Sequence, residues 1–342
     1  MSAHREAGTG AGAGVGGEAG AEAAARAAVL RSWGFELPDS LFLFEEFLAA
    51  LTPESARTLA DLDVSPTGIM DVLADPSRAP RPGIDIRSHG RYYRDPPEFL
   101  TFLHGGSDGL HYGLWFGDGR TCDGVASYYT HDGGGIALHS TGTPLTAVRD
   151  IIERVWRDLH DDDPTNPTNP TNPEQSPRLR SVAQLRTELC AFETADRPEL
   201  GLDYSRSYDP GFVPRTVDPA RLTTLDEAGA LVEGDTILDR PPHNGADEYR
   251  FAQYVYAQFE DPTVVSDWVT EARDRCAAGD PAEALALGRD LHWASAGDPA
   301  LEAHAHDLLT LAYRALDRPH LAALVTAVRG HRDQPSVDVL AD

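Results

Sequence analysis

The sequence predicts an α+β fold: an N-terminal antiparallel sheet with flanking helices, followed by a mostly helical second domain with a short sheet. Three observations lead to this prediction. Short aromatic-rich runs alternate with turn residues between positions 90 and 129, helical periodicity fills the last third of the chain, and a proline-rich tract lies between the two regions. A length of 342 residues is enough for two domains, each with its own core.

The first domain is expected to begin with a helix and to continue as an antiparallel meander. Apolar residues recur at helical spacing from Leu41 to Leu51, just after Pro38. A second helix with one apolar face is expected at 145–159 and closes the domain, so the helices pack on one face of the sheet. Strands are expected at 91–93, 99–103, 110–116 and 124–129.

The domain boundary is predicted at the repeated Pro-Thr-Asn tract. Its four prolines remove backbone donors and restrict the residues before them, which is typical of a semi-extended linker. The Gly/Ala-rich start cannot bury enough surface to order itself. We therefore expect a disordered tail at 1–21, a first domain at 22–160, a linker at 161–177 and a second domain at 178–335.

The second domain is predicted to be mainly helical. Asp-Pro pairs at 280–281 and 298–299 favour helix starts, because aspartate caps a helix and proline is tolerated in the first turn. Helices are expected at 181–194, 246–259, 263–277, 281–292, 299–315 and 319–330, with a short strand at 230–232.

Composition narrows the classes of function. A net charge of −26 opposes direct binding to nucleic acid, whose recognition needs clustered cations. No run approaches the roughly 20 apolar residues of a membrane span. Three widely spaced cysteines favour a reducing, cytoplasmic location. The exposed acidity, without a long heptad pattern, favours a monomer.

Common catalytic signatures are missing from the sequence. It holds no phosphate loop, zinc-protease motif, nucleophile elbow or dinucleotide fingerprint, and its Gly-rich runs read as hairpin turns. Two histidine pairs, His104 with His111 and His304 with His306, lack further ligands, so no metal site is expected. The run Arg91-Tyr92-Tyr93-Arg94-Asp95-Pro96-Pro97-Glu98-Phe99 predicts a rigid extended turn, with Tyr92, Tyr93 and Phe99 anchored in the core.

That run, together with other motifs, resembles the histone PARylation factor family. The similar segments are Gly34–Asp39, Gly68–Ala74, Arg91–Phe99 and Gly109–Phe116 in the first half, with Ala284–Leu291 and Leu308–Leu316 in the second. The family's animal members complete the active site of poly(ADP-ribose) polymerases. A glutamate acts there as the base for a substrate serine, and a nearby arginine supports the joint site.

The resemblance implies an accessory factor that docks on an ADP-ribosyltransferase of the poly(ADP-ribose) polymerase type and redirects it towards serine. NAD would then be bound by the transferase, and this chain would hold no cofactor alone. Arg240 matches the family arginine, as a partner- or substrate-binding residue. Ungapped counting places Ala277 and Ala278 at the family's acidic pair, so Asp280 and Glu283 are the candidate catalytic acids.

Two other classes of function stay open on the residues alone. Asp280 is also suited to capping a helix, Glu283 to a first helical turn and Arg240 to a salt bridge. A non-catalytic protein-binding module of the immunity or scaffold type is therefore the alternative. An enzyme acting alone is the third class, and no NAD-binding signature supports it.

Overall fold

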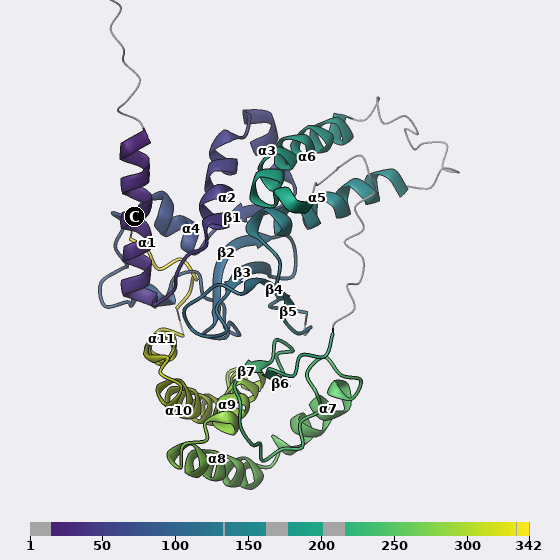
Figure 1. Cartoon of the computed structure of the whole chain (residues 1–342). Coiled ribbons are helices and arrows are strands. Elements are labelled where there is room, and N and C mark those ends of the chain that lie inside the picture. The colour runs from purple at the N-terminus through teal and green to yellow at the C-terminus, as the bar shows by residue number, and fades with distance from the viewer. Residues whose placement is uncertain (1–14, 133, 162–176, 201–215, 333, 342) are drawn as a thin grey trace, which may run out of the picture.

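A five-stranded antiparallel sheet lies at the centre of the structure (Figure 1). The computed structural model describes residues 15–132, 134–161, 177–200, 216–332 and 334–341. The strand order β1-β2-β3-β4-β5 follows the sequence, which confirms the predicted antiparallel meander. The strands are β1 (Val64–Pro66), β2 (Phe99–Gly105), β3 (Leu110–Trp115), β4 (Gly124–Tyr129) and β5 (Ala137–His139).

The predicted strand at 91–93 is wrong, because this segment is a loop that leads into β2. The backbone of this segment is not paired with a neighbouring strand. The Arg91 guanidinium instead donates hydrogen bonds to carbonyl oxygens of the same loop. The short strands β1 and β5 were not predicted. Each has only three residues and is held by its longer neighbour, β2 or β4.

Helices of the first half of the chain cover one face of the sheet (Figure 1). Phe44 of α2 packs edge-on against Phe102 of β2, and Phe47 packs against Phe192 of α6. Phe44, Phe47 and Phe102 are fully buried, and the burial of each contributes roughly 1.5–3 kcal/mol. These helices are α2 (Asp39–Ala50), α3 (Pro53–Asp61), α4 (Ile69–Ala74), α5 (Pro144–Asp161) and α6 (Pro177–Asp196), while α1 (Val15–Trp33) lies beside the sheet and contacts α11.

The second half packs on the opposite face of the sheet. Phe99, Trp115 and Tyr128 form a separate cluster there with Phe251 and Trp293. Both faces are covered, so every residue of β3 is buried. The elements of this half are β6 (Arg221–Leu222), β7 (Ala230–Leu231), α7 (Glu248–Gln258), α8 (Pro262–Ala277), α9 (Ala282–Ala294), α10 (Pro299–Ala315) and α11 (Pro319–Gly330).

The predicted division into domains stays a prediction. Most of the predicted linker at 161–177, and residues 1–14 of the predicted tail, lie outside the described residues. Helix α1 begins at Val15, within the segment 1–21 that was expected to be a disordered tail. Helix α6 falls within the predicted second domain, yet it packs against α2, α3 and α5 of the first half.

The C-terminal segment returns to the first half of the chain. Val337 and Val339 accept hydrogen bonds from the backbone N–H groups of Gly90 and Arg81, at 2.8 and 2.9 Å. Leu340 forms an antiparallel bridge with Pro80 and is 5% exposed. Residues about 250 positions apart in the sequence therefore share one network of backbone hydrogen bonds.

Candidate functional site

The structure brings Arg240 and Glu283 together. Arg240 follows the β6–β7 hairpin, and Glu283 lies in the first turn of α9. An Arg240 Nη2 to Glu283 Oε1 distance of 2.9 Å joins them, and Asp290 Oδ2 lies 2.8 Å from the same nitrogen. Arg240 Nη1 also donates to the carbonyl of Thr223 at 2.7 Å. One guanidinium is therefore shared by two carboxylates of α9.

This cluster is closed to solvent. The side chains of Arg240, Glu283 and Asp290 are 2%, 0% and 0% exposed. Glu283 Oε2 accepts a hydrogen bond from the N–H of Ile237 at 2.7 Å, so both carboxylate oxygens are engaged. Burial raises the pKa of Asp290 to about 6, and the attraction of Arg240 only partly offsets this effect. In this conformation Glu283 anchors the segment 237–240 to α9 and does not face a substrate.

Asp280 is the accessible acid of the predicted pair. It is partly exposed at the turn between α8 and α9, beside the exposed residues 277–279. Its Oδ1 accepts from the N–H of Ala282 and its Oδ2 from the N–H of Asp235, both at 3.2 Å. Among the described residues, no ion pair joins Asp280 to Arg240. The catalytic roles of Asp280 and Glu283 stay predictions.

A second buried cluster adjoins the first on α9. Arg289 contacts Asp226 at 2.6 Å and Glu98 at 3.3 Å, and its guanidinium lies 5.2 Å from the ring of Trp115. Sequence reasoning missed Arg289, Asp290 and Asp226. The available signal was a pair of opposite charges in the middle of an otherwise apolar helix, since Ala282 to Trp293 are all buried.

The loop at 91–98 links the sheet to α9 and α10. Asp95 accepts from Tyr128 at 2.7 Å and contacts His111 Nε2 at 2.8 Å. Burial disfavours its charge, but His111, with help from Arg91 and Tyr128, holds the Asp95 pKa below its usual value. Glu98 accepts from the hydroxyl of Tyr313 on α10 at 2.8 Å. The predicted rigid turn is therefore built around buried carboxylates.

The predicted anchoring by aromatic residues is only partly correct. Phe99 is fully buried, whereas Tyr92 and Tyr93 are half-buried. The ring of Tyr92 stacks on His111 at a centroid separation of 4.1 Å, and the Arg332 guanidinium lies 3.7 Å from the Tyr93 ring. The Tyr93 hydroxyl donates to the carboxylate of Glu302 on α10, so this ring links the loop to the helical half.

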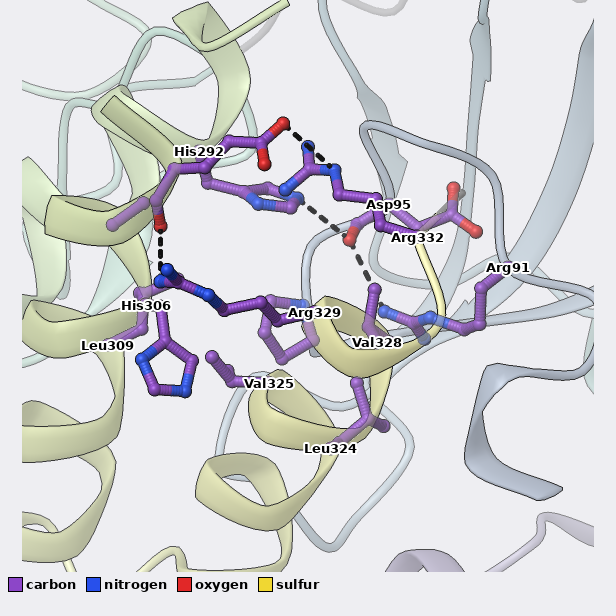
Figure 2. Close-up of a pocket in the computed structure, with 13 residues that line it drawn as sticks. Arg91, Asp95, His292, His306, Leu309, Leu324, Val325, Val328, Arg329 and Arg332 are labelled. Carbon is purple, nitrogen blue, oxygen red and sulfur yellow. Dashed lines mark hydrogen bonds and ion pairs between the residues drawn. The ribbon is translucent and has the colours of Figure 1, made fainter. Parts of the chain in front are cut away.

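A small crevice lies between this loop, α10 and α11 (Figure 2). Arg91, His292 and Arg332 form its polar side, and Leu324 and Val325 contribute to its apolar side. Its volume of about 20 Å³ holds roughly one water molecule, too little for a substrate. Burial, with repulsion from Arg332, lowers the pKa of His292 to about 3. His292 is therefore neutral at physiological pH, and its Nε2 lies 3.1 Å from the Asp95 carbonyl.

A metal site, a membrane-spanning helix and a reactive thiol at Cys122 all find little support in the described parts of the chain. No group of three or more His, Cys, Asp or Glu residues there is arranged to hold a metal ion. No helix there combines the length and apolarity needed to cross a bilayer. Burial raises the pKa of the Cys122 thiol to about 11, which disfavours the reactive thiolate.

Comparison with known proteins finds one family model that is similar to part of the chain. The family model described as Histone PARylation factor 1 matches residues 24–171, which confirms the resemblance there. No curated protein matches the chain. The matched region contains the sheet and the loop at 91–98, while Arg240, Asp280 and Glu283 lie beyond it. The resemblance of the second half therefore stays a prediction.

Proposed function

From the histone PARylation factor domain at residues 24–171, we propose that this protein is an accessory factor of protein ADP-ribosylation. It docks on an ADP-ribosyltransferase of the poly(ADP-ribose) polymerase type and redirects modification towards serine. The family match is the observation that carries this proposal. The contact between Arg240 and Glu283 supports it, because the resemblance singles out both residues although 43 positions separate them.

We assign the two acids different tasks within this proposal. Asp280 is partly exposed, so its carboxylate is placed to take a proton from a serine hydroxyl presented by a partner. Glu283 holds Arg240 and the backbone of Ile237, and it would reach a substrate only if this cluster opened. NAD is supplied by the active site of the transferase.

The exposed tyrosines of α7 supply a docking surface for the transferase: Tyr249 and Tyr256 lie on one side of the helix, and Tyr254 lies on a flank. Tyr249, Tyr254 and Tyr256 are 75%, 50% and 45% exposed. Tyrosine is enriched at protein interfaces because it offers a large contact area at a low entropic cost. Phe251 of the same helix lies against Arg240, with 5.3 Å between guanidinium and ring. Docking on α7 would therefore occur close to the candidate site.

A non-catalytic binding module is the second candidate function. The observation that favours it is the complete burial of Glu283 beside Arg240. A protein of this kind would use the tyrosines of α7 for binding and would contribute no base. The two candidates differ in whether the charge of Asp280 matters once the partner is bound.

The test uses the poly(ADP-ribose) polymerase-type transferase of the same genome, with modified residues mapped by mass spectrometry. Addition of the wild-type protein should shift automodification from acidic residues to serine. Asp280→Asn should abolish the shift and leave binding intact, because asparagine caps helices as well as aspartate does. Asp298→Asn is the matched control, since Asp298 caps α10 through the N–H groups of Ala300 and Leu301.

Two outcomes would contradict the proposal. If the protein binds the transferase but the modified residues stay the same, the binding module is correct. If Tyr249→Ser combined with Tyr254→Ser leaves binding unchanged, α7 is not the docking surface. Leu311→Ser serves as the control for loss of an exposed apolar side chain, since Leu311 is 40% exposed on α10.

A further inference from the structure

A second hollow, much larger than the crevice, lies in the first half of the chain. It has a volume of about 330 Å³ and opens to solvent between α5 and the β3–β5 part of the sheet. This volume is at the lower end of the range for pockets that bind small molecules. The groove is lined by Leu110, Tyr112, Ser127, Tyr129, His139, Asp150, Arg154 and Arg157.

The strand register explains why the groove is polar. Tyr112 pairs with Ser127, and Leu110 pairs with Tyr129, so these side chains share one face of the sheet. Further along the same face, Leu114 pairs with the buried Val125, where the sheet meets the core. The apolar face of the sheet therefore becomes a row of hydroxyl groups towards this end of β3 and β4.

Helix α5 turns a charged face to these strands. Asp150, Arg154 and Arg157 recur at positions i, i+4 and i+7, so they lie on one side of the helix. The apolar side, including Val148 and Ile152, packs into the core. The groove is thus formed where the polar side of α5 faces the polar end of the sheet.

Arg154 is held in position on the groove wall. Its Nη2 donates to the Tyr112 hydroxyl at 3.2 Å, and its Nε donates to the Asp150 carbonyl at 3.3 Å. Tyr129 also hydrogen-bonds to Arg154. Burial raises the pKa of Tyr112 to about 12, so its hydroxyl keeps its proton at neutral pH. A fixed guanidinium flanked by hydroxyl groups matches the geometry of a phosphate.

The charge of the groove contrasts with that of the whole chain. The protein carries 55 acidic residues against 29 lysines and arginines, whereas the groove is lined by two arginines and one aspartate. In a strongly acidic protein, the fixed guanidinium of Arg154 offers a local positive charge that attracts an anion to that place. His139 and Ser127 add further groups that can donate to phosphate oxygens.

We propose that this groove binds an organic phosphate of mononucleotide size. Arg154 and the hydroxyl groups of Tyr112 and Ser127 contact the phosphate. The partly exposed ring of Tyr129 provides a surface on which a base can stack. The groove exceeds the needs of an inorganic ion, and its rings and Leu110 suit an apolar or aromatic part of the ligand. The inference is independent of the proposed function, because no residue of the groove belongs to the candidate site.

The test is isothermal titration calorimetry with AMP, adenosine and inorganic phosphate as separate probes. AMP should bind saturably at one site, adenosine should bind at least about tenfold more weakly, and phosphate should compete with AMP. Arg154→Gln should weaken AMP binding by about tenfold or more, the loss expected for a charge-assisted contact. Arg120→Gln is the control, since Arg120 is 66% exposed and pairs with Glu36 outside the groove.

A second variant keeps the test valid if Arg154→Gln disturbs folding. His139 is exposed at the edge of the groove, so His139→Glu adds a negative charge without disturbing the core. It should weaken AMP binding by about tenfold and leave the melting temperature unchanged. Equal affinity for AMP and adenosine, unchanged AMP affinity in His139→Glu, or no saturable AMP binding would overturn the proposal.

Discussion

Replacement of Glu283 by alanine should strongly destabilise the protein, whatever its effect on activity. The substitution removes one of two carboxylates from a guanidinium that is 2% exposed. It also leaves the N–H of Ile237 without its acceptor at 2.7 Å. The guanidinium stays buried, so water cannot replace its lost contact, and the N–H of Ile237 is partly shielded from water.

The expected magnitude follows from these contacts. Breaking a buried ion pair costs about 3–5 kcal/mol, and Asp290 remains beside Arg240, which favours the lower part of that range. The orphaned N–H adds about 1–3 kcal/mol. We therefore expect a loss of about 4 kcal/mol, a large share of the 5–15 kcal/mol typical of folded proteins.

Urea denaturation of the wild type and variant measures this loss directly. Asp280→Ala is the comparison, because it removes a partly exposed capping contact worth about 1 kcal/mol. A double-mutant cycle with Arg240→Met should give a coupling energy of about 1–3 kcal/mol. A loss below about 1 kcal/mol for Glu283→Ala would refute the reasoning and would indicate that the cluster is loosely held.

Three further predictions concern other buried groups. The pKa of His292 is lowered to about 3 in the folded state, so the unfolded state takes up the proton first and acidification destabilises the fold. Between pH 6.5 and pH 5 the wild type should lose about 2 kcal/mol more of its free energy of unfolding than His292→Gln does, as measured by urea denaturation. An equal loss in the two proteins would contradict this prediction. Arg289→Met leaves Asp226 and Glu98 without their cation, so it should cost about 3–5 kcal/mol by the same measurement, whereas Arg273→Met, which breaks an exposed pair, should have little effect. Gly90→Ala would place a Cβ 2.5 Å from the Gly68 Cα, whereas the Cβ of Gly83→Ala would meet open space at a similar positive φ. Thermal unfolding should show Gly90→Ala to be less stable than Gly83→Ala by about 2 kcal/mol, and equal stability of the two variants would exclude the clash.

The elements with local signals were predicted well from the sequence. Helix α10 begins where Asp298 caps it before Pro299, and the aspartate accepts from two N–H groups of the first turn. Strands β3 and β4 were found because each is an apolar run bounded by turn residues. Such signals act within a few residues, so they can be read without knowledge of the fold.

The buried charge clusters could not be predicted in this way. Arg289 meets Asp226 across 63 positions, and Leu225 donates to Asp290 across 65. No spacing rule connects such distant residues. The loop at 91–98 was recognised as a rigid turn, but the strand expected at its start was wrong because the side chain of Arg91 satisfies the loop carbonyls.

The pairing of Leu340 with Pro80 has a consequence for how the molecule comes apart. Residues 337–340 join the helical half to residues 80–90, which lie between β1 and β2, so the C-terminal segment acts as a clasp between the two halves. A large rotation of one half against the other would break these contacts and expose the face of the sheet that carries Phe99, Trp115 and Tyr128. We therefore expect a binding partner to be accommodated by movements of side chains and surface loops, without separation of the two halves.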